Sequence, residues 1–395
     1  MKTRVSIAVL LVFLAALGLR WGYGAGQERR ARDQDEGVYL AIARNFTAGQ
    51  GLVLSPWRRA AFPPGYPLFL AFLEKAGWGS WPRLRFVQGF LGALTAVSLY
   101  FQARLCFRRF SWNGTAGIWA AVLAAVWPPL IVYAARAMTE TLFLFLLQSG
   151  MVLVLAAERG LRGGAPAGGV LLGAAALCRP VILPFLPAAL FWLALPGVGG
   201  RRCYFRAGWF AAAAVVVLTP WTWRNFRLFG ALVPVATQSG NILYLANNPV
   251  ATGGTGSIAR LIESGVYHTG EKEDEIAYSR AYGSAALKHI AADPRRFLSL
   301  SRRRLIWFLH LDGHGNVPAA TAALWTLFIL AAVGMAVSRR SPREIFLPLF
   351  LILEIVVTHM IVPPEGRYRL AMMPQIMLFA AAALAWAVVP AGDER

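Results

Sequence analysis

The sequence predicts an all-α integral membrane protein, and its composition and charge pattern are the evidence for that fold class. The chain has 395 residues, of which 57% are hydrophobic and only 15% are charged. Because a helix that crosses a bilayer needs about 20 mostly apolar residues, this chain can supply about ten such helices. Basic residues stand between the apolar runs, as is typical of the turns of membrane proteins. A soluble enzyme, a nucleic-acid-binding protein and a disordered chain fit this pattern poorly.

Ten apolar runs are predicted to cross the membrane. In chain order they lie at about 5–19, 84–105, 114–133, 138–157, 166–178, 180–196, 207–222, 318–338, 344–362 and 371–390. The first run follows Lys2 and Arg4 and ends near Trp21, an interfacial anchor. It is therefore interpreted as a retained helix rather than a cleaved signal peptide. Pro180 divides the fifth run from the sixth, because proline interrupts a helix.

Ten spans would place both chain termini in the cytoplasm. With that topology every arginine-rich turn between spans faces the cytoplasm, as the positive-inside rule requires. These turns contain Arg104, Arg108, Arg109, Arg159, Arg162, Arg201, Arg202, Arg206, Arg339, Arg340 and Arg343. Two long external loops remain, at about 21–83 and 223–317. The sequence has no internal repeat, so residues 1–395 are interpreted as one transmembrane domain.

The net charge of the chain indicates an anionic ligand. Lys and Arg total 39 against 19 Asp and Glu, a formal net charge of +20, and all but four of these cations are arginine. The arginines form no continuous basic face, which argues against nucleic acid. Several lie in the external loops, where guanidinium groups suit bidentate contact with phosphate. A wrongly assigned topology and a GC-rich coding sequence are the alternative explanations.

The segment 33–46 in the first external loop predicts a short interfacial helix. Its apolar residues recur at helical spacing on one face: Tyr39, Ile42, Ala43 and Phe46. Asp33 as the N-cap, with Glu36 three residues later, resembles a capping box. That interpretation leaves Asp35 without a capping role, beside the membrane surface and near several arginines. Such a carboxylate can act as a base or an electrostatic partner, or it is a solvated acid of the first turn.

The motif Asp35-x-x-x-Tyr39 opens a series of short motifs that follow one another along nearly the whole chain. The others lie at residues 43–51, 63–67, 128–140, 178–180, 220–225, 240–249 and 367–374. In this order they resemble GT-C-fold glycosyltransferases of the family 39 and aminoarabinose-transferase type. The resemblance implies a GT-C-like bundle of about ten membrane-spanning helices, with interfacial helices in the external loops.

The resemblance also implies an activity. Enzymes of this type take a sugar from a polyprenyl-phosphate carrier and place it on an acceptor at the periplasmic or external face of the membrane. For this chain it implies a glycosyltransferase of a bacterial inner membrane whose acceptor is a glycan, a lipid or a protein. Direct displacement, with Asp35 orienting or deprotonating the acceptor hydroxyl, would invert the configuration of the sugar.

The same resemblance implies which residues act. Asp35 matches the catalytic carboxylate after the first span, and the neighbouring Glu36 is kept as an alternative. Glu140 matches a second acid at the outer start of the fourth span, although an i,i+4 ion pair with Arg136 is a competing explanation. The candidate substrate-binding residues are Tyr39, Arg136, Arg179, Arg224, Asn225, Arg367, Tyr368 and Arg369. Guanidinium groups suit this reaction because negative charge develops on the departing phosphate.

No cofactor or metal is predicted, and a divalent metal is possible but not indicated. His310, Asp312 and His314 alternate as metal ligands can. They are interpreted instead as the solvated end of an amphipathic interfacial helix at about 302–309. The three cysteines have neither metal-ligand spacing nor the even number of a disulfide framework.

Two other classes of protein remain open. A lipid or polysaccharide transporter is one, because the short helices around Arg179 resemble the discontinuous helices of transporters. The other is a non-catalytic GT-C-like subunit of an envelope assembly. Convergence of Asp35, Glu140 and the external arginines on one site would favour the enzyme.

Overall fold

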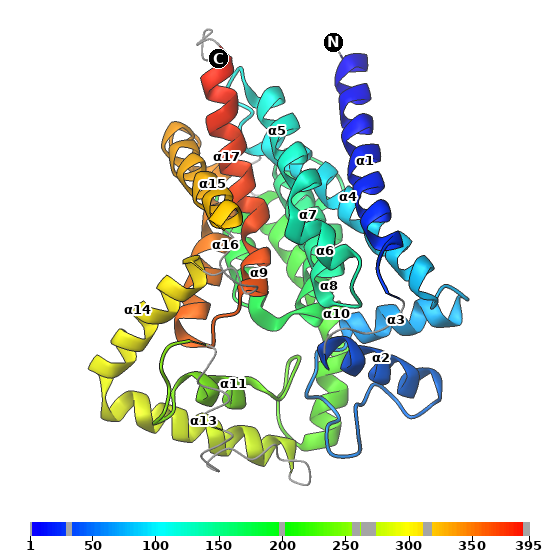
Figure 1. Ribbon diagram of the computed structural model, residues 1–395, viewed down its shortest axis with the longest axis vertical. Helices are drawn as coiled ribbons and strands as arrows, with labels where there is room; N and C mark the ends of the chain where they lie inside the picture. The colour runs from blue at the N-terminus through cyan, green and yellow to red at the C-terminus, as the bar shows by residue number, and fades with distance from the viewer. Residues whose placement is uncertain are drawn as a thin grey trace.

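The computed structural model is a helical bundle with a layer of shorter helices across one end. It describes residues 2–28, 34–196, 202–254, 261, 274–310 and 318–389, and none of these forms a β-strand. Long helices run side by side, and both chain termini lie at the same end of the bundle (Figure 1). We call this the terminal end, and the opposite end, where α2, α11 and α13 lie, the outer end.

Each of the ten predicted apolar runs contains a helix within the described residues. Six described helices are long and apolar enough to cross a membrane: α1 (Lys2–Ala25), α4 (Trp81–Cys106), α7 (Thr139–Glu158), α10 (Arg202–Phe229), α15 (Pro318–Val337) and α16 (Pro342–Ile361). A seventh candidate joins α5 (Asn113–Val126) to α6 (Pro128–Ala134) across a 55° bend. Three shorter apolar helices are α8 (Gly164–Cys178), α9 (Phe185–Ala194) and α17 (Met373–Val388). The fold class is confirmed, and the number of crossings stays a prediction.

The predicted interruption at Pro180 is present. α8 ends at Cys178, Arg179 has an extended backbone with φ −145° and ψ 108°, and the 3-10 turn η1 (Pro180–Ile182) precedes α9. Proline has no N–H and disfavours helical geometry in the residue before it, which explains the break. Arg179 therefore lies between two helices rather than on the side of one.

A buried arginine supports the bend between α5 and α6. Pro128 and Pro129 have no N–H to donate. The carbonyl groups of Ala124 and Ala125, four residues earlier, therefore lose the donors of a continuous helix. Arg20 of α1, which is 2% exposed, donates to these two carbonyl oxygens at 2.9 and 3.0 Å. The buried guanidinium of Arg20 thus replaces the missing backbone donors.

Replacement of Gly92 by alanine is expected to destabilise the bundle through this arginine. A Cβ atom at Gly92 would lie 2.6 Å from Nε of Arg20, which cannot move away and keep its hydrogen bonds to α5. Overpacking of this kind costs about 1–3 kcal/mol. Gly89→Ala is the matched control, because its Cβ would meet Arg20 at 3.5 Å, an ordinary contact. Thermal unfolding in detergent should show a lower Tm for Gly92→Ala and an unchanged Tm for Gly89→Ala. Equal Tm values for the two variants would contradict the support of the bend by Arg20.

Within the described residues, five helices form the layer at the outer end. They are α2 (Gln34–Thr47), α3 (Gly65–Lys75), α11 (Ser239–Ala246), α13 (Glu275–Ala292) and α14 (Pro294–His310), and all belong to the two predicted external loops. α2 confirms the predicted helix, with Ile42 and Ala43 buried on its apolar face, and its interfacial position stays a prediction. Asp33 lies outside the described residues, so its predicted capping box with Glu36 stays a prediction.

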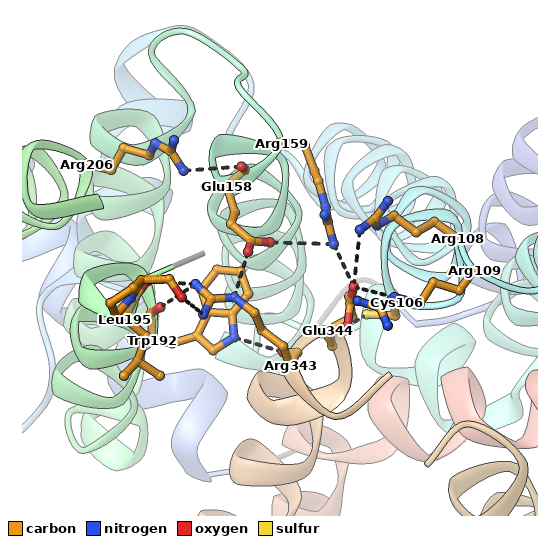
Figure 2. Close-up of polar contacts among 11 residues, drawn as sticks. Cys106, Arg108, Arg109, Glu158, Arg159, Trp192, Leu195, Arg206, Arg343 and Glu344 are labelled. Carbon is orange, nitrogen blue, oxygen red and sulfur yellow. Dashed lines mark hydrogen bonds and ion pairs between the residues drawn. The ribbon is translucent and has the colours of Figure 1, made fainter. Parts of the chain in front are cut away.

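Several arginine-rich turns that were predicted to share one side of the membrane meet at the terminal end. Figure 2 shows ion pairs there between the carboxylates of Glu158 and Glu344 and the guanidinium groups of Arg108, Arg109, Arg159 and Arg343. Their common position agrees with the predicted topology. That this end faces the cytoplasm stays a prediction.

Candidate functional site

Four short segments meet at the outer end of the bundle. They are the first turn of α2, the turn between α6 and α7 with the start of α7, the break after α8, and the 3-10 helix η2 (Gly366–Ala371). Their side chains form three ion pairs: Asp35 with Arg367, Glu36 with Arg136, and Glu140 with Arg179. Six of the predicted site residues are thus paired with one another.

The first pair is the most exposed. Oδ2 of Asp35 lies 2.6 Å from Nη1 of Arg367, and the Asp35 side chain is 30% exposed. The same guanidinium also contacts Glu365, whose Oε2 is 2.7 Å from Nε. Burial lowers the pKa of Arg367, but the neighbouring Tyr368 and Glu365 raise it to a net upward shift. The guanidinium of Arg367 therefore stays charged between two carboxylates.

The second pair is buried. Nη1 of Arg179 lies 2.8 Å from Oε1 of Glu140, which is 2% exposed. Glu140 occupies the first turn of α7, where the helix dipole favours a negative charge. The ring of Tyr368 lies close to both arginines, with its centroid 5.1 Å from the guanidinium carbon of Arg179 and 5.2 Å from that of Arg367. This ring joins the two ion pairs into one site.

The third pair corrects the competing explanation for Arg136. α6 ends at Ala134 and α7 begins at Thr139, so Arg136 and Glu140 do not share a helix and the i,i+4 geometry is wrong. Nε of Arg136 instead lies 2.8 Å from Oε1 of Glu36, which is 1% exposed. This ion pair fixes the start of α2 to the turn before α7. It therefore also fixes the position of the neighbouring carboxylate, Asp35.

Replacement of Glu36 by glutamine is expected to destabilise the protein by about 3–5 kcal/mol, because it removes the charge that compensates a largely buried guanidinium. Adding Arg136→Met should recover part of that loss, since the uncompensated charge is then gone. Denaturant unfolding of the two variants tests this expectation. Equal stability of Glu36→Gln and the unmodified protein would show that the pair contributes little.

Two tyrosines form an apolar wall beside the ion pairs. The ring of Tyr39 makes edge contacts with Tyr66 at 5.5 Å and with Phe62 at 6.2 Å between centroids. Tyr66 is fully buried and donates its hydroxyl to Gln88 at 3.0 Å. Burial, and then the charge of Glu140, raise the pKa of Tyr39. Its phenol therefore stays neutral and can donate a hydrogen bond.

Arg224 and Asn225 belong to a different group of contacts. The guanidinium of Arg224 lies 4.3 Å from the ring centroid of Trp221 and donates to the carbonyl of Arg59 at 3.1 Å. Asn225 is fully buried and donates to the carbonyl of Val233 at 3.1 Å. These bonds hold two loop segments against the end of α10. Their contacts thus give both residues a structural role.

The residues around η2 are divided between two tasks. Arg367 and Tyr368 belong to the site, whereas Arg369 donates to the carbonyls of Phe308 and Leu309 in the last turn of α14, at 3.3 and 3.4 Å. Glu365 is a site residue that the sequence analysis did not identify. Glu365 lies two residues before Arg367, and this spacing was the signal available in the sequence.

The described residues offer no metal site, since no three His, Cys, Asp or Glu side chains among them converge on one point. Asp312 and His314 lie outside those residues, so the interpretation of that motif stays a prediction. The site instead combines a part-exposed carboxylate with two charged guanidinium groups. Such a set can take a proton from a hydroxyl and stabilise a departing anion.

The helical bundle with its outer layer is the GT-C fold of membrane proteins. Comparison with solved structures establishes this, whereas no protein family and no curated protein sequence matches the chain. One similar structure is the oligosaccharyltransferase AglB from Archaeoglobus fulgidus in complex with an inhibitory peptide and a dolichol-phosphate. It is 14% identical, with a TM-score of 0.62 over 98% of this chain and 50% of that chain. The apo form of the Archaeoglobus fulgidus oligosaccharyltransferase gives a TM-score of 0.58 at 14% identity, over 97% and 50%.

A further structure, ArnT from Cupriavidus metallidurans in the apo state, is 15% identical with a TM-score of 0.42, over 95% of this chain and 76% of that chain. At 14% identity, the similarity to the two oligosaccharyltransferase structures shows the fold alone. This chain spans half the length of the oligosaccharyltransferase that it matches.

Proposed function

We propose that this chain is a membrane glycosyltransferase that moves a sugar from a polyprenyl-phosphate carrier to a glycan, lipid or protein acceptor. The reaction takes place at the outer end of the bundle. We assign that end to the periplasmic or external face of a bacterial inner membrane, with both chain termini in the cytoplasm.

The ion pair of Asp35 with Arg367 is the observation that supports this proposal most directly. It joins a carboxylate that is 30% exposed to a charged guanidinium, and the pair lies at the outer end of the apolar bundle. The buried pair of Glu140 and Arg179 adds a second guanidinium through the shared ring of Tyr368. The similar archaeal oligosaccharyltransferase was solved with a dolichol-phosphate, which supports this class of carrier.

The proposed reaction is a direct displacement. Asp35 accepts the proton of the acceptor hydroxyl as the hydroxyl oxygen attacks the anomeric carbon. The bond between that carbon and the phosphate oxygen breaks on the opposite side, so the configuration of the sugar inverts. Arg179 and Arg367 stabilise the negative charge that develops on the carrier phosphate.

An incoming phosphate has to compete with carboxylates, because each guanidinium of the site already has an acidic partner. The Glu365 side chain is 34% exposed, so it can leave Arg367 with little loss of burial. Glu140 is 2% exposed and remains with Arg179. The phosphate therefore takes the place of Glu365.

A transfer assay with defined donors tests the proposed function. The full chain in detergent is mixed with a panel of polyprenyl-phosphate sugars and a membrane extract as the source of acceptor. Donor consumption should release free polyprenyl phosphate and label the acceptor. A folded protein that releases no carrier from any donor of the panel would contradict the assignment as an enzyme.

A transporter is the second candidate, because Arg179 lies in an extended break between two apolar helices. Reconstitution in vesicles separates the two functions. Movement of the intact sugar-carrying lipid between leaflets, with no release of carrier, would favour transport. Carrier release that depends on the acceptor would favour transfer.

A further inference from the structure

The terminal end carries a second charged cluster, which the proposed reaction does not use. Glu140 and Glu158 stand at opposite ends of α7, a 20-residue helix that separates them by roughly 30 Å. We define the terminal cluster by six side chains: Arg108, Arg109, Arg159, Arg343, Glu158 and Glu344 (Figure 2). They come from the turn after α4, the end of α7 and the start of α16.

One part of this cluster is structural. Nε of Arg343 lies 2.7 Å from Oε1 of Glu158, and its other nitrogens donate to the carbonyls of Leu195 and Pro196 at 2.9 and 3.0 Å. The guanidinium also lies 5.4 Å from the ring centroid of Trp192. These contacts fasten α16 to the end of α9 and satisfy the donors of Arg343.

The other part has more positive than negative charge. Oε1 of Glu344 is shared by Arg159 at 2.9 Å, Arg109 at 3.4 Å and Arg108 at 3.6 Å. The cluster as a whole sets four guanidinium groups against two carboxylates, an excess of two positive charges. A single carboxylate oxygen cannot satisfy three guanidinium groups, each of which has five N–H donors.

Two of these arginines are exposed. The side chains of Arg108 and Arg109 are 43% and 53% exposed. Within the described part of the chain, their contacts with Glu344 are their only polar interactions. Two adjacent guanidinium groups therefore share one carboxylate, while about half of each side chain stays exposed where the helix α4 ends.

We infer that Arg108 and Arg109, with Arg159 beside them, form a binding site for a phosphate group. Guanidinium groups recognise phosphate oxygens through paired, charge-assisted hydrogen bonds. The site lies where two apolar helices long enough to cross a membrane, α4 and α7, end. Basic clusters at the ends of membrane-spanning helices attract anionic headgroups. The phosphodiester of an anionic phospholipid and free inorganic phosphate both supply this chemistry. This inference does not depend on the proposed transferase activity.

Binding measurements on the full chain test the site. Phosphatidylglycerol and inorganic phosphate are titrated separately in neutral detergent, and the rise in Tm reports binding. The double variant Arg108→Gln/Arg109→Gln should weaken phosphatidylglycerol binding about 30-fold, since each cation near a headgroup contributes on the order of tenfold or less. Arg108→Lys/Arg109→Lys keeps the positive charge beside Glu344, so it should fold like the unmodified protein and lose only part of the affinity. A loss of affinity in this variant therefore reports on binding and not on folding.

The matched control is Arg162→Gln/Arg339→Gln. It removes the same charge from exposed positions in the same turns as Arg159 and Arg343, and it should leave affinity within about threefold. If Arg108→Gln/Arg109→Gln loses more affinity than the control for phosphatidylglycerol alone, the site binds a lipid headgroup. If it also loses more affinity for inorganic phosphate, the site accepts phosphate from either source. Equal losses in the two glutamine pairs would overturn the inference, because only the general surface charge would then matter. Absence of binding by both ligands would overturn it as well.

Discussion

Replacing Asp35 by asparagine is expected to lower the turnover of sugar transfer by about 10²–10⁴-fold, the usual contribution of a general base. Asparagine has nearly the same shape, but it cannot accept the proton of the acceptor hydroxyl. It also loses the charge that faces Arg367 at 2.6 Å. Initial rates of polyprenyl phosphate release, measured with saturating donor, report this effect directly.

Glu365→Gln is the matched control for that experiment. Asp35 and Glu365 contact the same guanidinium at 2.6 and 2.7 Å, and their side chains are 30% and 34% exposed. Removing Glu365 frees Arg367 for phosphate, so this variant should keep its turnover and bind the donor at least as tightly. If both variants lost turnover equally, the Arg367 pairing rather than the Asp35 base would be the cause. Full activity of Asp35→Asn would contradict the assignment of the base.

Replacing Arg179 by glutamine is expected to reduce turnover by about 10²–10³-fold, the range seen when one stabilising donor of a developing anion is lost. It should also destabilise the fold, because Glu140 is left buried without its counter-charge at 2.8 Å. Removal of one member of a buried ion pair costs about 3–5 kcal/mol. Turnover and unfolding are therefore measured on the same preparations.

The double variant Glu140→Gln/Arg179→Gln separates the two effects. Two neutral amides can hydrogen-bond to each other, so stability should return toward that of the unmodified protein. Turnover should stay low, because no guanidinium faces the phosphate from this position. If turnover recovered together with stability, Arg179 would serve the fold and Arg367 would stabilise the phosphate alone.

The helices could be predicted because their signals are local. A run of apolar residues long enough for a bilayer indicates a span wherever it occurs, and Pro180 interrupts a helix whatever surrounds it. The spacing of the apolar residues of segment 33–46 indicated a helix in the same way, and α2 is that helix. The order of short motifs along the chain can also be recognised without knowledge of packing. It identified four parts of the site as candidates: Asp35, Glu140, Arg179 and the Arg367 region.

The partners of these residues could not be predicted. Spacing suggested that Arg136 pairs with Glu140, but the chain turns between α6 and α7 and sends the two side chains to different elements. Arg224 stands in a motif beside tryptophan, as a ligand-binding arginine can, yet it stacks on Trp221 and holds a loop. Such choices depend on which segments meet in space, and they leave no periodic signal in the sequence.

The excess of arginine shows the same division. From composition and spacing alone, the sequence determined that this is an all-helical membrane protein whose cations gather in turns and outer loops. Only the tertiary structure decided which arginines already have partners within the protein. Arg20 replaces the missing donors at a bend, Arg343 fastens two helices, and Arg367 shares two carboxylates. Whether a charged side chain can bind a ligand depends on the partners that it already has within the protein. Those partners come from distant parts of the chain.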